Sequence, residues 1–576
     1  MSLKVTGRAR VLAGSHKASR VLQSILKYGT PAQVASLSAE LVPDVAALAK
    51  DPYGTHLVRR LIDAAAKEEL QALVAVFKPG AARLARHPFA APALDALYVR
   101  CTASQRASLL ATFYGPQVAL ARNAAASKGG QGASVTLASV LQAQATIAGR
   151  RSVLTHVAAA LTPILEKGLV SFAYVHRLLA EYLPVVGTAG LADAAASVAG
   201  PALLRMIHTP DGARAASMLL AGASARERKA CVKALKGRVV DVATDACGHV
   251  ALLAALECID DTTLLSKGLL SEVQGQLLKV MQHPTARRLV LNLLHPRCGR
   301  YLPPDIMAAL PVVQDVAAAP PADGTAADAA PETAAGGDAG GDSDGDGDDE
   351  DDDDDHGVGD GKPGVLATSK KPPSVRRAQL LAFLARALVQ TCSANAGVLL
   401  GHATGCDVMY EVARGGEGDA LRTAAGDAAI QEVVDAIAAA VTASESAAPS
   451  GDGGAAASTP LREDFHASRT LRRLVLDSPQ AAAALWKGCL AAHVAKWATG
   501  HGAKVLAACV ACGDAGTRAA AGAAVQKQPG LVAKGQTPAA WAAQFMHSEH
   551  AEPAPAAAEA GKQATRAGGK VATQKK

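Results

Sequence analysis

Small residues recur at a fixed spacing in front of amphipathic segments, and this period constrains the fold more than any other feature of the sequence. Ala18, Gly54 and Ala90 are spaced 36 residues apart, and so are Gly212 and Gly248. Each follows a polar or proline-containing turn and precedes an apolar pattern with helical periodicity. Such a period over several cycles predicts a helical solenoid, in which each unit buries its apolar face only against its neighbours.

The same pattern continues in the second half of the chain. Ala286 follows Gly248 after 38 residues, Ala467 precedes Gly502 by 35, and ATGCDVMYEVA around Gly405 is a further copy. Each unit is predicted to hold a helix, a turn and a second helix that begins with D/H-P-x-G, with proline at the helix start, where its missing N–H costs little. Only 3% of the residues are aromatic and roughly a fifth are alanine, which favours helices and excludes an all-β fold.

Charge and low-complexity segments divide the chain. The formal net charge is +6, but residues 338–355 hold twelve acidic residues and no basic one, so the remainder carries +18. A basic body predicts a polyanionic partner, and the acidic tract either competes for the basic surface or serves only as a solubilising linker. We predict repeats over 1–315, a disordered acidic linker over 316–373, further repeats over 374–546 and a disordered basic tail over 547–576.

At this level the units resemble Pumilio (PUF) repeats, of the divergent nucleolar branch called Puf-A or Penguin, which carries a C-terminal CPL region. The resemblance rests on SHKASRVLQSILKYG (15–29), KDPYGTHLVRRLI (50–62), MIHTPDGARAASMLL (206–220), DACGHVALLAALECIDDT (245–262), HPTARRLVLNLLHPR (283–297) and FHASRTLRRLVL (465–476). It implies an all-α fold, a right-handed α-solenoid of Pumilio-type helical repeats in two subdomains. It also implies a nuclear, nucleolar scaffold of large-subunit ribosome assembly, with rRNA or pre-ribosomal RNA, mRNA or DNA, and pre-ribosomal proteins as partners.

In members of this family that recognise RNA base by base, the side chains at positions i, i+1 and i+4 of the second helix of a repeat contact one base. This spacing suits two edge-reading side chains around one stacking side chain, because i and i+4 lie close together around a helix. Ser19, Arg20 and Gln23 keep the pattern in the first repeat, and the triad resembles an adenine-type reader. Later repeats offer stacking or charge instead, so we expect base-by-base readout to be largely lost. The residues that we predict to contact RNA there are His56, Arg59, Tyr174, Arg177 and Arg214.

Positive charge recurs beside or within the second helices. Further predicted RNA contacts in the second half are Arg287, Arg288, Arg469, Arg472, Arg473 and Lys504. A basic stripe without edge-reading side chains favours sequence-tolerant, salt-sensitive binding through phosphates. The alternative is that these cations form a solvated outer face. Aromatic residues are too few for a stacking platform along the whole surface, so duplex or structured nucleic acid is as compatible as a single strand.

The remaining motifs predict neither a metal site nor a phosphate-binding loop. Cys509 and Cys512 form one CxxC without a second pair at a suitable spacing, which favours a core helix over a zinc site. The glycines of 357–364 lack the Ser/Thr that a phosphate loop needs after Lys362. Histidines near the turns are expected to cap or pack. They are His16, His87, His208, His249, His283, His466 and His501.

We therefore expect a monomeric binding protein without enzymatic activity, metal or cofactor. The chain has no apolar run approaching the ~18 residues of a spanning helix, so we expect no membrane association. Scattered cysteines predict reduced thiols and an intracellular location. Two other functions stay open: a protein-interaction solenoid of HEAT or armadillo type, and an mRNA-binding translational repressor.

Overall fold

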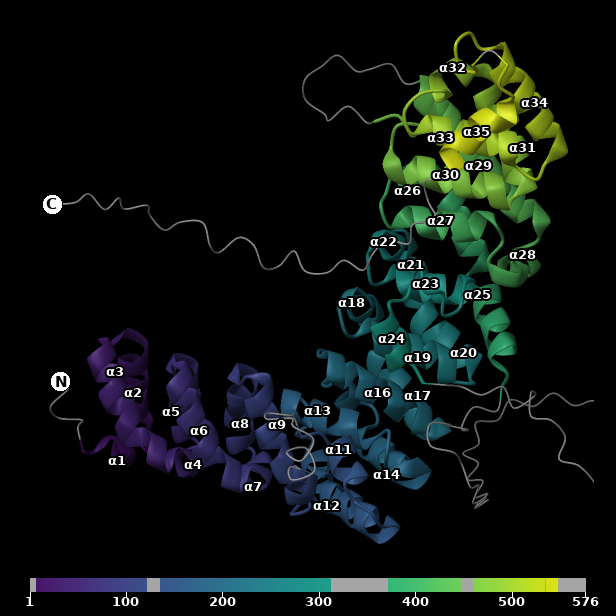
Figure 1. Cartoon of the computed structure of the whole chain (residues 1–576). Helices are drawn as coiled ribbons and strands as arrows, with labels where there is room; N and C mark the ends of the chain where they lie inside the picture. The colour runs from purple at the N-terminus through teal and green to yellow at the C-terminus, as the bar shows by residue number, and fades with distance from the viewer. Residues whose placement is uncertain (1–6, 122–134, 312–370, 447–458, 534, 547–576) are drawn as a thin grey trace, which may run out of the picture. The chain divides into compact units, whose positions relative to one another are not determined.

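A computed structural model describes residues 7–121, 135–311, 371–446, 459–533 and 535–546 (Figure 1). Helices, turns and connecting segments make up this described part, in which no β-strand occurs, so the predicted all-α class is confirmed. None of its helices combines the length and the apolar character that crossing a bilayer requires. The predicted acidic linker and basic tail lie outside the described residues, apart from 371–373.

The chain forms two compact units, which are described separately. The first takes its helices from Met1–Glu272 and Leu302–Leu380, and the second from Val273–Tyr301 and Leu381–Lys576. This division differs from the boundaries that we predicted near 315 and 374, because the helices of 273–301 pack with the C-terminal repeats. Helix α25 (Pro373–Ala394) begins in the first unit and ends in the second.

One set of helices follows the turns that the repeat period marks, and consecutive members pack against each other. We call them the ladder helices. In the first unit they are α2 (His16–Tyr28), α5 (Gly54–Ala64), α8 (Ala90–Arg100), α13 (Ala173–Tyr182), α16 (Pro210–Gly222) and α19 (His249–Cys258). In the second unit they are α23 (Arg287–Leu294), α27 (Gly405–Ala413), α30 (Phe465–Asp477) and α33 (Gly502–Ala511).

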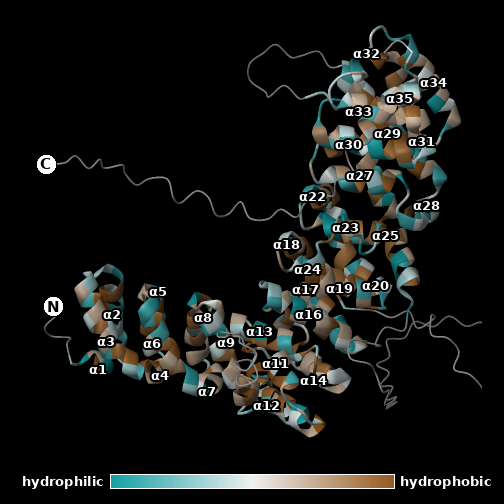
Figure 2. Cartoon of the chain, viewed as in Figure 1, coloured by the Kyte–Doolittle hydropathy of each residue, from teal (hydrophilic) through white to brown (hydrophobic). Residues whose placement is uncertain are grey.

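The remaining helices complete the repeats. The longer ones are α3 (Pro31–Leu41), α6 (Lys67–Phe77), α9 (Ala103–Leu110), α12 (Ile147–Glu166), α14 (Gly187–Val198), α17 (Ala225–Leu235), α29 (Asp427–Ser446), α31 (Pro479–Gly488), α34 (Ala515–Lys527) and α35 (Pro538–Met546). The short ones are α1 (Ala9–Ala13), α4 (Val45–Leu48), α7 (Ala81–Ala85), α11 (Leu137–Gln142), α15 (Pro201–Leu204), α18 (Val239–Thr244), α20 (Thr262–Leu265), α21 (Ser271–Gly275), α22 (Leu277–Gln282), α24 (Pro304–Ala309), α26 (Ala396–Leu400), α28 (Ala420–Ala425) and α32 (Val494–Trp497). Most ladder helices carry both apolar and polar residues (Figure 2), and their apolar positions, such as Leu57 and Leu61 of α5, are buried.

The turns before the ladder helices are closed by side chains that accept backbone hydrogen bonds. The Asp51 carboxylate accepts from the N–H groups of Tyr53 (2.9 Å) and Gly54 (2.7 Å). Imidazole Nδ1 atoms do the same in other repeats, where His87 accepts from the Phe89 N–H and His283 from two backbone N–H groups. These bonds satisfy donors that a helix start leaves without partners. The capping role that we predicted for His87 and His283 is confirmed.

The small residue at the start of a ladder helix lies against a backbone carbonyl of the segment before it. A Cβ atom at Gly54 would lie 2.5 Å from the carbonyl oxygen of Leu48, and one at Gly212 would lie 2.1 Å from that of Met206. Glycine at these two positions therefore allows the ladder helix to pack closely on the segment before it. Pro210 occupies the start of α16 as predicted, but Pro52 lies in the turn before α5, where the prediction of a helix-initiating proline is wrong.

Cysteine placement agrees with the sequence analysis. All ten cysteines are free and eight of them are buried. Burial raises the pKa of the Cys509 thiol on α33, and the Cys512 thiol donates to the Cys509 carbonyl oxygen at 3.2 Å. Within the described ranges, no group of three or more His, Cys, Asp or Glu residues is arranged to hold a metal ion.

His176 joins α13 to α16 and is fully buried. Its two ring nitrogens lie 2.7 Å from the hydroxyl of Thr209 and 2.7 Å from the carbonyl oxygen of Val170. Burial lowers the pKa of this imidazole to about 4, because the charged form would lose its hydration.

We predict that the chain loses stability in acid through His176. Its folded-state pKa lies below that of the unfolded chain, so the unfolded state takes up the proton first as the pH falls through 6.5. The free energy of unfolding should fall by about 2 kcal/mol between pH 7.5 and pH 5 from this group. NMR of the His176 ring should show neutral imidazole at pH 5, and a titration midpoint above pH 6 would contradict the prediction.

We also predict that Gly212→Ala destabilises the first unit. The new methyl group would clash with the Met206 carbonyl and press on His176 and Thr209, each 2.9 Å away. Overpacking of this kind lowers the free energy of unfolding by about 1–3 kcal/mol. The control is Gly80→Ala in the same unit, where the nearest atoms lie 3.9 Å from the added Cβ. Urea unfolding followed by circular dichroism measures both, and equal stabilities would refute the steric account.

Candidate nucleic-acid interface

Several ladder helices carry a basic residue two residues after the small residue, whereas α8, α19 and α27 carry Pro92, Val250 and Asp407 there. In the first unit, Arg20, His56 and Arg214 occupy this position and are exposed. In the second unit, Arg469 is exposed and Lys504 is half-buried at the same position. Because the ladder helices pack in register, these side chains lie at the same phase of successive repeats.

Arg59, one helical turn after His56 on α5, adds a further exposed cation. Within the part of the chain that the structure describes, Arg20, Arg59, Arg214 and Arg469 form no ion pair. Their charge is therefore open to a mobile anion. Six of the fourteen residues predicted to contact RNA form this set: Arg20, His56, Arg59, Arg214, Arg469 and Lys504.

Two side chains of the first-repeat triad, Ser19 and Gln23, form hydrogen bonds within the fold. Ser19 is 1% exposed, and its hydroxyl donates to the carbonyl oxygen of Tyr53 at 3.1 Å. The Gln23 amide in turn donates to the Ser19 hydroxyl at 3.2 Å. Thr55 repeats the link in the next unit, since its hydroxyl donates to the Phe89 carbonyl oxygen at 2.7 Å. In α2 and α5 the first triad position thus ties the ladder helix to the next turn, and this role was missed in the sequence.

Tyr174 and Arg177 of α13 are not free for a ligand in this structure. The Tyr174 ring is 1% exposed and stacks on Phe172 with ring centroids 5.8 Å apart. The Arg177 guanidinium pairs with Glu181 at 2.8 Å and with Asp211 at 3.3 Å. The position of Tyr174 does not support the predicted base contact, because its ring belongs to the core.

Acidic partners also hold the arginines of α23 and α30 in the second unit. Asp407 of α27 lies between these helices and pairs with Arg287 at 2.5 Å and with Arg473 at 3.7 Å. The Arg473 guanidinium also stacks over the Tyr410 ring, 3.6 Å from its centroid. Both arginine side chains are 18% exposed. Their charge links three consecutive ladder helices, a role that the sequence analysis did not foresee.

Arg288 and Arg472 already have interaction partners in the structure. Arg472 is 5% exposed, and Arg288 is half-buried. On α30 the exposed cation is Arg469, three residues before Arg472. We therefore leave Arg287, Arg288, Arg472 and Arg473 out of the candidate interface, together with Ser19, Tyr174 and Arg177, and Gln23 stays a prediction.

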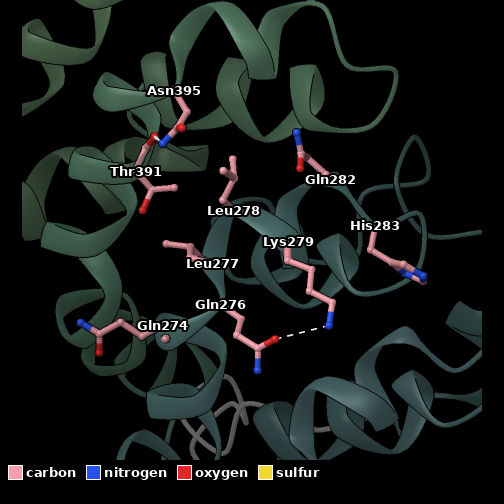
Figure 3. Close-up of a pocket in the computed structure, with 10 residues that line it drawn as sticks. Gln274, Gln276, Leu277, Leu278, Lys279, Gln282, His283, Thr391 and Asn395 are labelled. Carbon is pink, nitrogen blue, oxygen red and sulfur yellow. Dashed lines mark hydrogen bonds between the residues drawn. The ribbon is translucent and has the colours of Figure 1, made fainter.

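An open hollow of about 720 Å³ lies in the second unit between the segment that holds α21 and α22 and the end of α25 (Figure 3). No carboxylate lines it. The polar side chains that line it are Gln274, Gln276, Lys279, Gln282, His283, Thr391 and Asn395. The Lys279 ammonium donates to the Gln276 amide oxygen at 3.4 Å. Amides and one cation suit contact with polar neutral or anionic groups.

Comparison with known proteins gives two family matches within the chain. The Pumilio-family RNA binding repeat matches residues 18–42 and 44–76, and the CPL (NUC119) domain matches residues 363–483. The chain is 33% identical to "Pumilio homolog 24" of Arabidopsis thaliana over 518 residues, which cover 89% of this chain and 78% of that protein. "Pumilio homology domain family member 6" of Schizosaccharomyces pombe aligns over 22% of its own length at 32% identity, and "Pumilio homolog 3" of Rattus norvegicus over 46% at 25% identity.

The fold is similar to that of human Puf-A. Its crystal structure matches with a TM-score of 0.70 at 22% identity, covering 91% of this chain and 90% of that chain. The crystal structure of human Puf-A in complex with DNA matches with a TM-score of 0.69 at 22% identity, covering 91% of each chain. This similarity confirms the Pumilio-type helical repeat fold that the sequence predicted.

We predict that Asp407→Ala destabilises the second unit. The change leaves two largely buried guanidinium groups without their shared carboxylate, which should lower the free energy of unfolding by about 2 kcal/mol. Asp435→Ala is the control, because Asp435 is exposed on α29 and, among the described residues, its carboxylate bonds to Gln431 alone. Chemical unfolding of both variants gives the comparison. A loss as small as that of Asp435→Ala would mean that Asp407 does not hold the arginines.

Proposed function

Because this chain belongs to the Pumilio repeat family, in the Puf-A branch that carries a CPL domain, we propose that it is a nucleolar RNA-binding scaffold of ribosome biogenesis. It binds RNA mainly through the phosphate backbone and with little sequence preference, and it serves assembly of the large subunit. Pumilio-family repeat proteins are binding proteins rather than enzymes, which agrees with the expectation from sequence.

One observation carries the proposal. Among the described residues, arginines without an ion pair recur at the same position of α2, α16 and α30, while the side chains that would read base edges are absent or engaged in the fold. Arginines at this position contact phosphates, which position a nucleic acid without conveying its sequence. The crystal structure of human Puf-A in complex with DNA supports nucleic-acid binding as the function of this fold.

The binding mode is tested by removing cations from the ladder. The triple variant Arg20→Gln, Arg59→Gln, Arg214→Gln should weaken binding to RNAs of unrelated sequence by the same factor. If three phosphate contacts are lost on a single strand, the slope of log K against log salt should fall by about 2. Fluorescence anisotropy with labelled RNAs at several KCl concentrations between 50 and 200 mM measures both quantities.

A matched control removes three exposed cations from another helix of the same unit. Arg226, Lys229 and Lys233 are exposed on α17, so their replacement by Gln changes the net charge equally. This control should bind RNA almost as well as the unchanged chain. Equal losses for both triple variants would exclude a defined interface. Failure of the unchanged chain to bind any RNA at 50 mM KCl would favour a protein-interaction solenoid.

The cellular role needs a separate experiment. Ultraviolet cross-linking in cells, followed by sequencing of the bound RNA, should recover precursor rRNA of the large subunit, and the tagged chain should accumulate in the nucleolus. Recovery of mainly mRNA 3′ regions from the cytoplasm would overturn the ribosomal role and support translational repression instead.

A further inference from the structure

Two exposed aromatic side chains occupy the same position of consecutive turns in the first unit. Tyr53 and Phe89 are 36 residues apart and directly precede α5 and α8. Their exposed fractions are 42% and 43%, although most aromatic residues of this chain are buried or half-buried. The aromatic content is too low for a continuous stacking platform, but these two rings lie at adjacent turns of one ladder.

The backbone of both aromatic residues is held from two sides. The Tyr53 N–H donates to Asp51 at 2.9 Å and its carbonyl accepts from the Ser19 hydroxyl at 3.1 Å. Phe89 has the same pair of bonds, from its N–H to His87 at 3.3 Å and to its carbonyl from the Thr55 hydroxyl at 2.7 Å. A side chain on a fixed backbone loses less entropy when it binds a ligand. The turns therefore present these rings in a preorganised state.

Two exposed lysines lie on the segments around the first of these turns. Lys17 occupies the equivalent position of the first repeat and is exposed, and Lys50 is exposed three residues before Tyr53. The Asp51 carboxylate is taken up by backbone N–H groups. The ring of His16 lies 5.3 Å from that of Tyr53, centroid to centroid. Flat apolar rings beside ammonium groups suit a ligand that has both aromatic faces and negative charge.

We propose that the turns before α5 and α8 form a stacking site for unpaired nucleobases, with Tyr53 and Phe89 under the bases and Lys17 and Lys50 at the flanking phosphates. This inference rests on the proposed RNA-binding function and extends it, because it adds a preference for single strands over duplexes. The site lies outside the three helix positions that we considered for base reading. Stacking needs no base-edge contacts, so the preference carries no sequence specificity. An acidic protein segment is the competing ligand, and the experiment separates it.

The test compares Tyr53→Leu, Phe89→Leu with Tyr28→Leu. Leucine keeps an apolar side chain at each position but removes the aromatic face. Tyr28 is the control because it is 76% exposed at the opposite end of α2, beside Lys27. Binding is measured with a single-stranded RNA of mixed sequence and with an RNA duplex, both at 100 mM KCl. Loss of stacking should weaken single-strand binding at least about fivefold per base, leaving duplex binding unchanged.

Further measurements make the result decisive. A 2-aminopurine base in the single strand should lose fluorescence when the unchanged chain binds, and should lose less with the double Leu variant. Phe89→Trp should keep single-strand affinity, because it retains an aromatic face, and its folding is checked by circular dichroism. If the unchanged chain binds neither RNA, the proposed function itself fails. Unchanged RNA affinities of the double Leu variant, or competition by poly-glutamate that the two Leu changes abolish, would overturn the stacking site alone.

Discussion

The close contact between a glycine-initiated ladder helix and the backbone before it is the constraint on which the packing of those repeats depends. At Gly54 and Gly212 there is no room for a Cβ atom beside the preceding carbonyl oxygen. A helix that begins with a small residue can approach the short helix before it, and its next residues then meet the following repeat. Ser19 and Thr55 directly follow the small residue of their helices, and their hydroxyls donate to the carbonyl oxygens of Tyr53 and Phe89 in the next turn. Steric fit thus sets the period, and directional hydrogen bonds fix the register between repeats.

Arginines at similar sequence positions have different roles because their acidic neighbours differ. Arg214 on α16 is exposed, whereas Arg287 and Arg473 are held by Asp407 and Arg177 is held by Glu181 and Asp211. A partly buried guanidinium is costly without a partner, so the paired arginines contribute to the packing of the ladder. An exposed arginine needs no acidic partner within the fold, because water hydrates its charge, and it can exchange this water or a counterion for a phosphate. The number of basic residues on a solenoid therefore overstates the charge that it offers to a ligand.

The sequence predicted the elements that depend on local patterns. The period located the ladder helices, and the turn chemistry of His87 and His283 followed from their place before a helix. It did not predict which side chains face outward, because one residue along a helix turns the side chain by about 100°. On α30 even two arginines three residues apart on neighbouring parts of the helix surface differ, since Arg469 is exposed and Arg472 is 5% exposed. Nor did it predict partners from distant segments, such as Asp407 for Arg287, or the assignment of 273–301 to the second unit.

In one repeat, the proposed stacking contact with a base is compatible with the loss of side chains that read base edges. In the first repeat Ser19 has its hydroxyl committed to the Tyr53 carbonyl, so this hydroxyl cannot also donate to a base edge. The bond holds the turn that carries Tyr53, and the aromatic ring beside it stays exposed. A serine at this position thus supports a sequence-blind contact through the backbone that it fixes. Wherever a triad hydroxyl links two repeats, its presence in a sequence is evidence about repeat packing before it is evidence about base recognition.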